Sequence, residues 1–145
     1  MQNNSPLPST RFHLAFPVDD LVAARSFYKG LLGCREGRSN DHWVDFDFYG
    51  HQIVAHLVDR NKDTPIKNPV DGKMIPVRHF GLIVPFDEWE RLATQLRDAG
   101  VEFTVEPYIR FNGEAGEQGT FFVTDPAGNA LEFKAFRNED QIFAS

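Results

Sequence analysis

The chain has 145 residues with a formal net charge of -6, and it contains 14 phenylalanines and one cysteine. This length suits one compact domain, and the negative charge without a Lys/Arg cluster argues against a nucleic-acid partner. A single cysteine, Cys34, excludes an intrachain disulfide and a Cys-based zinc motif, which favours a reducing, cytoplasmic location. No apolar run is long enough to span a membrane. We therefore expect a flexible N-terminus over residues 1–10 and one soluble domain over residues 11–145.

The first half of the chain predicts the order β-α-β-β-β. Residues 11–18 alternate between apolar and other residues, as in a half-buried strand. Asp20 is placed to cap a helix that runs to about Leu32, and Gly33 stands where a helix C-terminal glycine belongs. Three further strands are expected over residues 34–38, 42–49 and 52–59.

The second half repeats this order after a connection. Residues 61–77 contain three prolines and no periodicity, so they predict a connection between module one (about 11–60) and module two (about 78–137). A strand is expected over 78–84 and a helix over 86–99, ended by Gly100. Strands follow over 101–107, 119–124 and 130–136, with residues 125–129 as the last turn.

The repeat places two histidines at equivalent positions. Aligning the opening strands superimposes His13 on His79, and a small residue, Ala15 or Gly81, follows each of them on the same strand face. A lone histidine in a strand is more often a hydrogen-bonded core residue than a metal ligand. Their coincidence in both modules favours a shared functional role.

A carboxylate is the third candidate ligand, beside the two histidines. Glu132 lies between Leu131 and Phe133 in an apolar strand, where a charge is costly unless a cation or several donors compensate it. Two histidines and one carboxylate hold a divalent ion by one face and leave open positions for substrate. We therefore predict that His13, His79 and Glu132 bind Fe(II), which we favour, or Mn(II), Ni(II), Co(II) or Zn(II).

The stretches FHLAFPVDDLVAARSFYKGLLGC, RHFGLIV and FFVTDPAGNALEFKAF resemble the vicinal oxygen chelate superfamily, over about residues 12–136. This superfamily includes glyoxalase I, extradiol dioxygenases, fosfomycin-resistance proteins and bleomycin-binding proteins. The resemblance implies an α+β fold of two tandem βαβββ modules that form a curled, barrel-like mixed sheet around a metal site. It also implies the same ligands, His13, His79 and Glu132.

Departures from the patterns of individual members narrow the expected function. Glyoxalase I has a fourth ligand where Val54 stands here, and extradiol enzymes have a tyrosine that residues 120–123 lack. We expect a metal-dependent enzyme that chelates a small substrate through adjacent oxygens, with dioxygenase-like, lyase or isomerase chemistry. A fosfomycin-resistance-like thiol transferase or hydrolase, and a metal-free bleomycin-type binding protein, are the alternatives.

Three further residues are candidates for catalysis. His56 shares a strand face with Val54, so it either serves as an acid-base residue or lies at an exposed tip. Arg110 and Gln118 belong to a polar, Gly-rich loop. This loop either closes over a substrate, with Arg110 binding an anionic group and Gln118 hydrogen-bonding it, or is a solvated hairpin loop. A homodimer is also expected, because such modules pair within one chain or between two.

Overall fold

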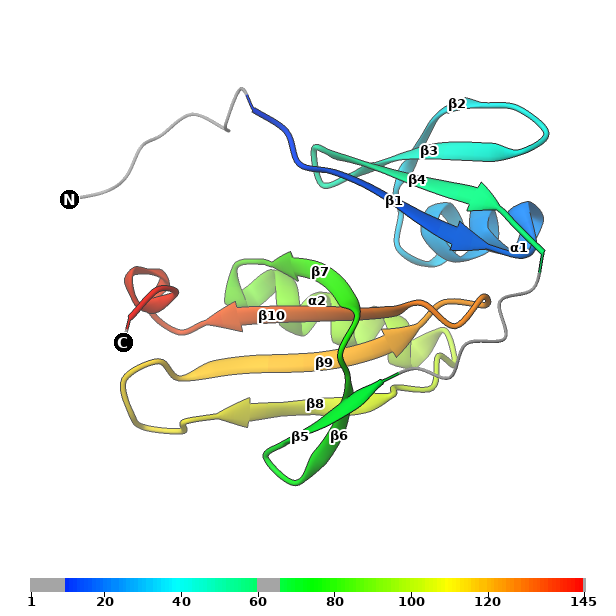
Figure 1. Cartoon of the computed structure of the whole chain (residues 1–145). Coiled ribbons are helices and arrows are strands. Elements are labelled where there is room, and N and C mark those ends of the chain that lie inside the picture. The colour runs from blue at the N-terminus through cyan, green and yellow to red at the C-terminus, as the bar shows by residue number, and fades with distance from the viewer. Residues whose placement is uncertain (1–9, 60–65, 145) are drawn as a thin grey trace. The chain divides into compact units, whose positions relative to one another are not determined.

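The structure is a computed structural model that describes residues 10–59 and 66–144. The chain divides into two compact units, Met1–Lys62 and Asp63–Ser145, which are described separately below. Figure 1 labels their elements in chain order.

The first unit is a four-stranded sheet with one helical segment. Its strands run in the order β1-β4-β3-β2, with β1 parallel to β4 and the other neighbours antiparallel. Its elements are β1 (His13–Val18), α1 (Leu21–Arg25), η1 (Ser26–Leu31), β2 (Arg35–Ser39), β3 (Trp43–Phe48) and β4 (His51–Leu57). This is the predicted β-α-β-β-β order.

The helical segment begins as predicted but changes its winding. The Asp20 side chain accepts a hydrogen bond from the Ala23 amide at 3.0 Å, which caps the first turn. After Arg25 the chain continues as the π-helix η1, in which the Leu32 amide donates to the Phe27 carbonyl. Gly33 then ends the segment with φ of +73°, a conformation that glycine adopts without steric cost. The apolar spacing predicts the helix but not its wider turn.

Aromatic rings fill the core between this helix and the sheet. Tyr28 is fully buried, and its ring centroid lies 5.3 Å from those of Phe16 and Phe46. These contacts occupy one face of the sheet. By alternation, the opposite face carries His13, Ala15, Val54 and the side chains beside them.

Cys34 belongs to this core, and burial raises the pKa of its thiol to about 12, with a contribution from Asp47. At pH 8 the folded protein is therefore expected to react with a chromogenic disulfide reagent roughly 1000-fold more slowly than the urea-unfolded protein, because only the thiolate attacks. The absorbance time course measures both rates. Equal rates would show that Cys34 is accessible and ionisable in the folded chain.

The second unit repeats the topology of the first. Its main sheet has the order β7-β10-β9-β8, again with one parallel pair, β7 and β10. Its elements are β5 (Lys67–Val70), β6 (Lys73–Pro76), β7 (His79–Ile83), α2 (Phe86–Asp98), β8 (Val105–Arg110), β9 (Gln118–Thr124), β10 (Ala130–Phe136) and η2 (Glu139–Gln141). The expected repeat of βαβββ modules in an α+β fold is confirmed.

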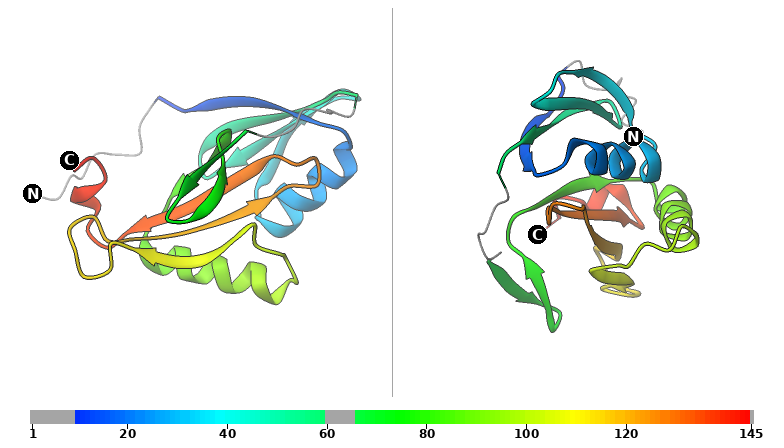
Figure 2. Two further views of the ribbon diagram at one scale, coloured as in Figure 1. Left: turned by 60° about the horizontal axis from the view of Figure 1, so that its bottom comes forward. Right: turned by 90° about the vertical axis from the view of Figure 1, so that its right-hand side faces the viewer.

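Helix α2 covers one face of this sheet (Figure 2). Trp89 anchors the helix, because its indole N–H donates to the Phe133 carbonyl at 2.9 Å inside the core. Its ring lies directly over Gly119, where an added Cβ would come within 2.8 Å of it. The helix therefore requires glycine at this position of β9.

The segment predicted as the connection between the modules contains a hairpin. Strands β5 and β6 pair with each other, and the Ile75 side chain packs with Val105 and Phe122 on the sheet face away from α2. Asp71, at the turn, adopts a left-handed conformation with φ of +52°. The expected connection over 61–77 thus contains a hairpin at residues 67–76 that the sequence analysis did not predict, while residues 60–65 lie outside the described part.

Strand β8 also differs from its prediction. The expected strand over 101–107 is displaced to Val105–Arg110, with an irregularity in its pairing to β9 between Val105 and Tyr108. Arg110 therefore ends a strand, and Gln118 begins one, although both were expected in a loop.

None of the described helices is long and apolar enough to cross a membrane.

Candidate metal centre

Two of the three predicted metal ligands meet on the sheet face opposite α2. The Nε2 atom of His79, at the start of β7, lies 3.2 Å from the Oε1 atom of Glu132 on β10. The Glu132 side chain is mostly buried, with 15% exposed, whereas 29% of the His79 side chain is exposed. The parallel register favours this contact, because His79 pairs with Ala130, and Glu132 follows two residues later on the same face of the sheet.

The second ring nitrogen of His79 has its own partner. Its Nδ1 lies 2.7 Å from the Pro76 carbonyl, which can only accept, so Nδ1 carries a proton. The edge of the Phe122 ring approaches the imidazole, with a centroid distance of 4.9 Å. The hydrogen bond to Glu132 raises the pKa of His79, outweighing the opposing effect of burial. The ring is thus fixed with Nε2 facing the carboxylate.

Glu132 is held ionised by two donors. Burial alone would raise its pKa, but the hydrogen bonds from His79 and Thr120 lower the pKa below the ordinary value. The Thr120 hydroxyl donates to Oε2 at 2.5 Å, which leaves Oε1 for the histidine side. The hydrogen bonds from His79 and Thr120 therefore offset the unfavourable free energy of burying this carboxylate.

The donor set of this pair fits a divalent metal ion. Nitrogen and oxygen ligands about 2.1 Å from an ion at a right angle are about 3 Å apart, close to the separation of His79 Nε2 and Glu132 Oε1. Each ligand atom also belongs to a side chain whose other polar atom is held, by Pro76 or Thr120. Such outer partners orient metal ligands and fix the imidazole tautomer.

His13 has a similar partner in the first unit. Its Nδ1 lies 2.8 Å from the Oε1 atom of Gln52, which in turn donates through Nε2 to Asp45 at 3.1 Å. A protonated Nδ1 leaves the lone pair of Nε2 free for a metal ion. Gln52 stands opposite His13 in the register, as Ala130 stands opposite His79.

The predicted ligand triad draws on residues of both units. Across residues 10–59 and 66–144, no three His, Cys, Asp or Glu side chains form a group that could hold a metal ion. His79 and Glu132 lie together in the second unit, and His13 belongs to the first. The participation of His13 therefore stays a prediction.

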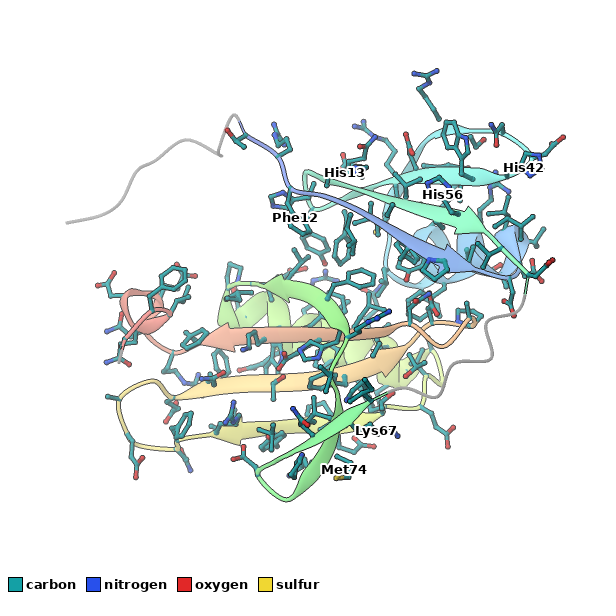
Figure 3. All side chains as sticks on the ribbon, viewed as in Figure 1. Phe12, His13, His42, His56, Lys67 and Met74 are labelled. Carbon is teal, nitrogen blue, oxygen red and sulfur yellow. The ribbon has the colours of Figure 1, made fainter. Side chains whose placement is uncertain are left out.

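The other predicted residues lie in different surroundings. His56 shares the sheet face of His13, but four residues separate their positions in the paired strands, or roughly 13 Å, and Figure 3 shows the two apart. It is exposed and stands opposite Trp43. Arg110 and Gln118 are direct partners across β8 and β9, on the face that carries Glu132. Their register position is that of Phe136, four residues along β10 from Glu132, which is the same separation as between His56 and His13. The structure thus places Arg110 and Gln118 on the face of Glu132 without bringing them closer to it than His56 is to His13.

Sequence reasoning missed Tyr108, Thr120 and Asp71. Thr120 on β9 lies two residues from Phe122, the cross-strand partner of Glu132. Tyr108 on β8 pairs with Thr120. Alternation along β9 and β8 could have placed Thr120, but the irregularity in β8 conceals the face of Tyr108. Asp71 contacts Tyr108 only through the undetected hairpin.

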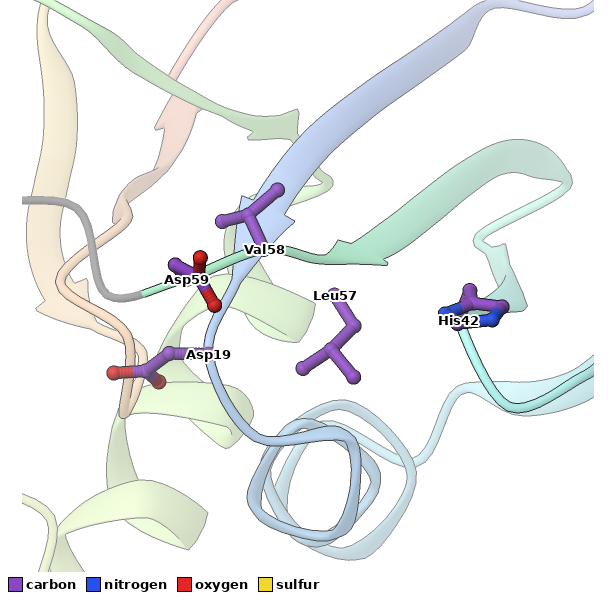
Figure 4. Close-up of a pocket in the computed structure, with 5 residues that line it drawn as sticks. All are labelled: Asp19, His42, Leu57, Val58 and Asp59. Atoms are coloured by element: carbon purple, nitrogen blue, oxygen red, sulfur yellow. The ribbon is translucent and has the colours of Figure 1, made fainter.

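A hollow in the first unit lies away from these residues. It is found at the ends of β1 and β4 and is lined by Asp19, His42, Leu57, Val58 and Asp59 (Figure 4). None of the predicted ligands or catalytic residues lines it, so it contributes nothing to the candidate site.

The chain is similar to a known protein family and to solved structures. The family model of the glyoxalase/bleomycin resistance protein/dioxygenase superfamily matches residues 11–133. A solved glyoxalase/bleomycin resistance protein/dioxygenase from Alicyclobacillus acidocaldarius is 32% identical, with a TM-score of 0.79 over 99% of this chain and 100% of that one. No curated protein is similar enough to count as a match.

Two more distant structures share the fold. The fosfomycin resistance protein FosX from Listeria monocytogenes is 18% identical, with a TM-score of 0.67 over 94% of this chain and 100% of that one. Lactoylglutathione lyase from Agrobacterium tumefaciens is 20% identical, with a TM-score of 0.62 over 88% and 94%. At these identities the likeness concerns the fold.

Proposed function

Because the chain belongs to the glyoxalase/bleomycin resistance protein/dioxygenase superfamily, we propose that it is a divalent-metal-dependent enzyme acting on a small substrate with two adjacent oxygens. The ligands are His13, His79 and Glu132. The observation that carries the proposal is the 3.2 Å approach of His79 Nε2 to a buried, ionised Glu132, with both side chains oriented by further hydrogen bonds.

A bound divalent ion, Fe(II) by preference, would act as a Lewis acid and as a template for the two substrate oxygens. The protein's own residues prepare this position. Pro76 and Thr120 orient the ligands, and the Phe122 ring packs edge-to-face against the imidazole of His79. Of the reaction types open to such a site, we favour dioxygenase-like ring cleavage or related lyase or isomerase chemistry.

Addition of water or a thiol to an epoxide, as in fosfomycin resistance, is the second candidate. Asp45 favours it, because this carboxylate is linked through Gln52 to His13 and could accept a proton from the attacking nucleophile. The Asp45→Asn variant would remove this base and keep a hydrogen-bond acceptor for Gln52.

Metal analysis followed by two activity assays tests the proposal. Protein purified without chelator is expected to hold nearly one divalent ion per chain. Oxygen uptake by the Fe(II)-loaded protein with a panel of catechols would support ring cleavage. Loss of fosfomycin in the presence of Mn(II), with or without thiol, would support epoxide opening. Failure to retain or take up any metal would contradict the proposal and favour a metal-free binding protein, the remaining alternative.

The proposed enzyme is expected to work as a homodimer in the cytoplasm. Size-exclusion chromatography with light scattering measures the mass in solution, and 16.5 kDa is the mass of one chain. A mass near twice this value would support the dimer, whereas the single-chain mass would contradict it.

A further inference from the structure

A cluster of charged and polar residues lies beside the His79–Glu132 pair, on the same face of the second unit. Tyr108 stands opposite Thr120 in the sheet, and Thr120 donates to Glu132. Tyr108 and Thr120 align with Lys134, two residues beyond Glu132. Two strand spacings of nearly 5 Å and this offset place the backbones of Tyr108 and Glu132 roughly 12 Å apart. A small molecule held at Glu132 could therefore extend to Tyr108.

The carboxylate of Asp71 binds to two hydrogen-bond donors of this cluster. Its Oδ2 accepts hydrogen bonds from the Tyr108 hydroxyl at 2.9 Å and from Arg110 Nε at 2.6 Å. Both bonds lower the pKa of Asp71. Two donors thus converge on one carboxylate oxygen, as they would in a receptor for a carboxylic acid.

The cluster retains capacity for a further anion. Arg110 carries five N–H donors, of which only Nε has a hydrogen-bond partner among the residues that the structure describes. Lys73 lies over the Tyr108 ring, with Nζ 4.0 Å from its centroid. Within the cluster, two cations, Arg110 and Lys73, thus stand against one carboxylate, Asp71.

Gln118 adds an unused acceptor to the same face. It is the cross-strand partner of Arg110 and is only 7% exposed. Its side-chain oxygen is buried without a hydrogen-bond partner among the described residues. An unpaired buried carbonyl is costly, so a donor group brought by a ligand would stabilise it.

The hairpin that carries Asp71 is held independently of this carboxylate. Ile75 packs with Val105 and Phe122, and Val70 and Tyr108 pack against that cluster. The Asp71 side chain itself is 40% exposed, whereas that of Arg110 is 22% exposed. Asp71 can therefore turn towards solvent while the hairpin stays in contact with the sheet.

From these contacts we propose that Arg110, Tyr108 and Lys73 bind a carboxylate group of the substrate, and that Asp71 occupies this receptor until the substrate displaces it. This inference rests on the proposed function, and it specifies the substrate as a small carboxylic acid that also bears two adjacent oxygens. Asp71 sets the specificity, because it competes with the substrate carboxylate for the same two donors.

A matched pair of probes tests the proposal on the Zn(II)-loaded full chain, where no oxygen chemistry intervenes. 3,4-Dihydroxybenzoate and 3,4-dihydroxybenzamide share the adjacent oxygens and differ in the carboxylate. Calorimetry is expected to show at least about tenfold tighter binding of the acid, since a hydrogen bond to a charged group contributes about that factor. Arg110→Gln should remove this preference without changing the affinity for the amide.

Two variants complete the design. Asp71→Asn is expected to strengthen binding of the acid about tenfold and to leave amide binding unchanged, a gain that misfolding could not produce. Arg97→Gln is the matched control, because Arg97 pairs with Glu106 on the exposed face of the unit and should not alter the preference. Equal binding of both probes to the wild type, or equal weakening of both by Arg110→Gln, would overturn the proposal.

Failure of the proposed metal function would give a different result. In that case Zn(II) would not strengthen binding of either probe. The receptor is then measured on metal-free protein by ligand-observed NMR with benzoate and benzamide. A preference for benzoate that depends on Arg110 would support the carboxylate receptor, and no preference would refute it.

Discussion

Replacing Glu132 with glutamine is expected to weaken binding of divalent metal by at least about 100-fold. The amide matches the carboxylate in shape and can still accept from Thr120, but it lacks the charge that a hard divalent ion requires. Loss of an outer hydrogen-bond partner already costs about 10- to 100-fold in affinity, and a direct ligand contributes more. Calorimetric titration with Mn(II) and elemental analysis of the purified protein both measure this change.

Glu106 provides the matched control for this variant. Its side chain is 67% exposed and forms an ion pair with Arg97 on the surface. Glu106→Gln removes the same charge from the same unit and should leave the metal content unchanged. Stoichiometric metal in the Glu132→Gln variant would show that Glu132 is not a ligand.

Gly81→Ala is expected to destabilise the second unit by about 3 kcal/mol, the upper part of the range for overpacking. A Cβ at this position would lie 1.6 Å from the Glu132 carbonyl oxygen, a backbone atom that cannot move without breaking the β7–β10 pairing. The sequence suggested that a small residue leaves space for the imidazole. The structure shows a stricter reason, because the space is taken by the backbone of β10.

Urea unfolding followed by tryptophan fluorescence measures this effect. Trp89 reports on the second unit, and Trp43→Phe removes the signal of the first. Gly30→Ala, in the first unit, is the control and should leave the Trp89 transition unchanged, because a Cβ at Gly30 would meet no atom within 4 Å. An unfolding midpoint of Gly81→Ala equal to that of the parent would show that β7 accommodates the side chain.

The repeat could be predicted from the sequence because its signals are local. The Asp20 cap, the alternating residues of β10 and the turn at Asp125 each depend on neighbours in the chain. Asp125 illustrates this, since its Oδ1 accepts from the amides of Ala127 and Asn129. Such contacts form wherever the local sequence recurs, so they specify elements without knowledge of the whole fold.

The hairpin over residues 67–76 could not be predicted because its stability is not local. Its two strands have four residues each and contain Pro69 and Pro76, which contradict the usual strand signals. Ile75 is buried only because Phe122 and Val105, distant in sequence, lie beneath it. Tyr108 was missed for a related reason, since the irregularity in β8 shifts the alternation on which its facing depends.

The candidate site shows the same division. Proximity of His79 to Glu132 follows from the repeat and the register of a parallel pair. Of the partners that orient them, Thr120 could have been placed by the alternation along β9, whereas Pro76 belongs to the hairpin that the sequence did not predict.

The register also bears on how such a chain can change during evolution. Val54 pairs with Ala15 in the first unit as Glu132 pairs with Gly81 in the second, and Val54 is 6% exposed. Valine and glutamate codons can differ by one nucleotide. A single mutation could therefore give both halves of the repeat a histidine and a carboxylate at equivalent positions. The duplicated architecture thus keeps within one genetic step an alternative coordination set that the present sequence does not use.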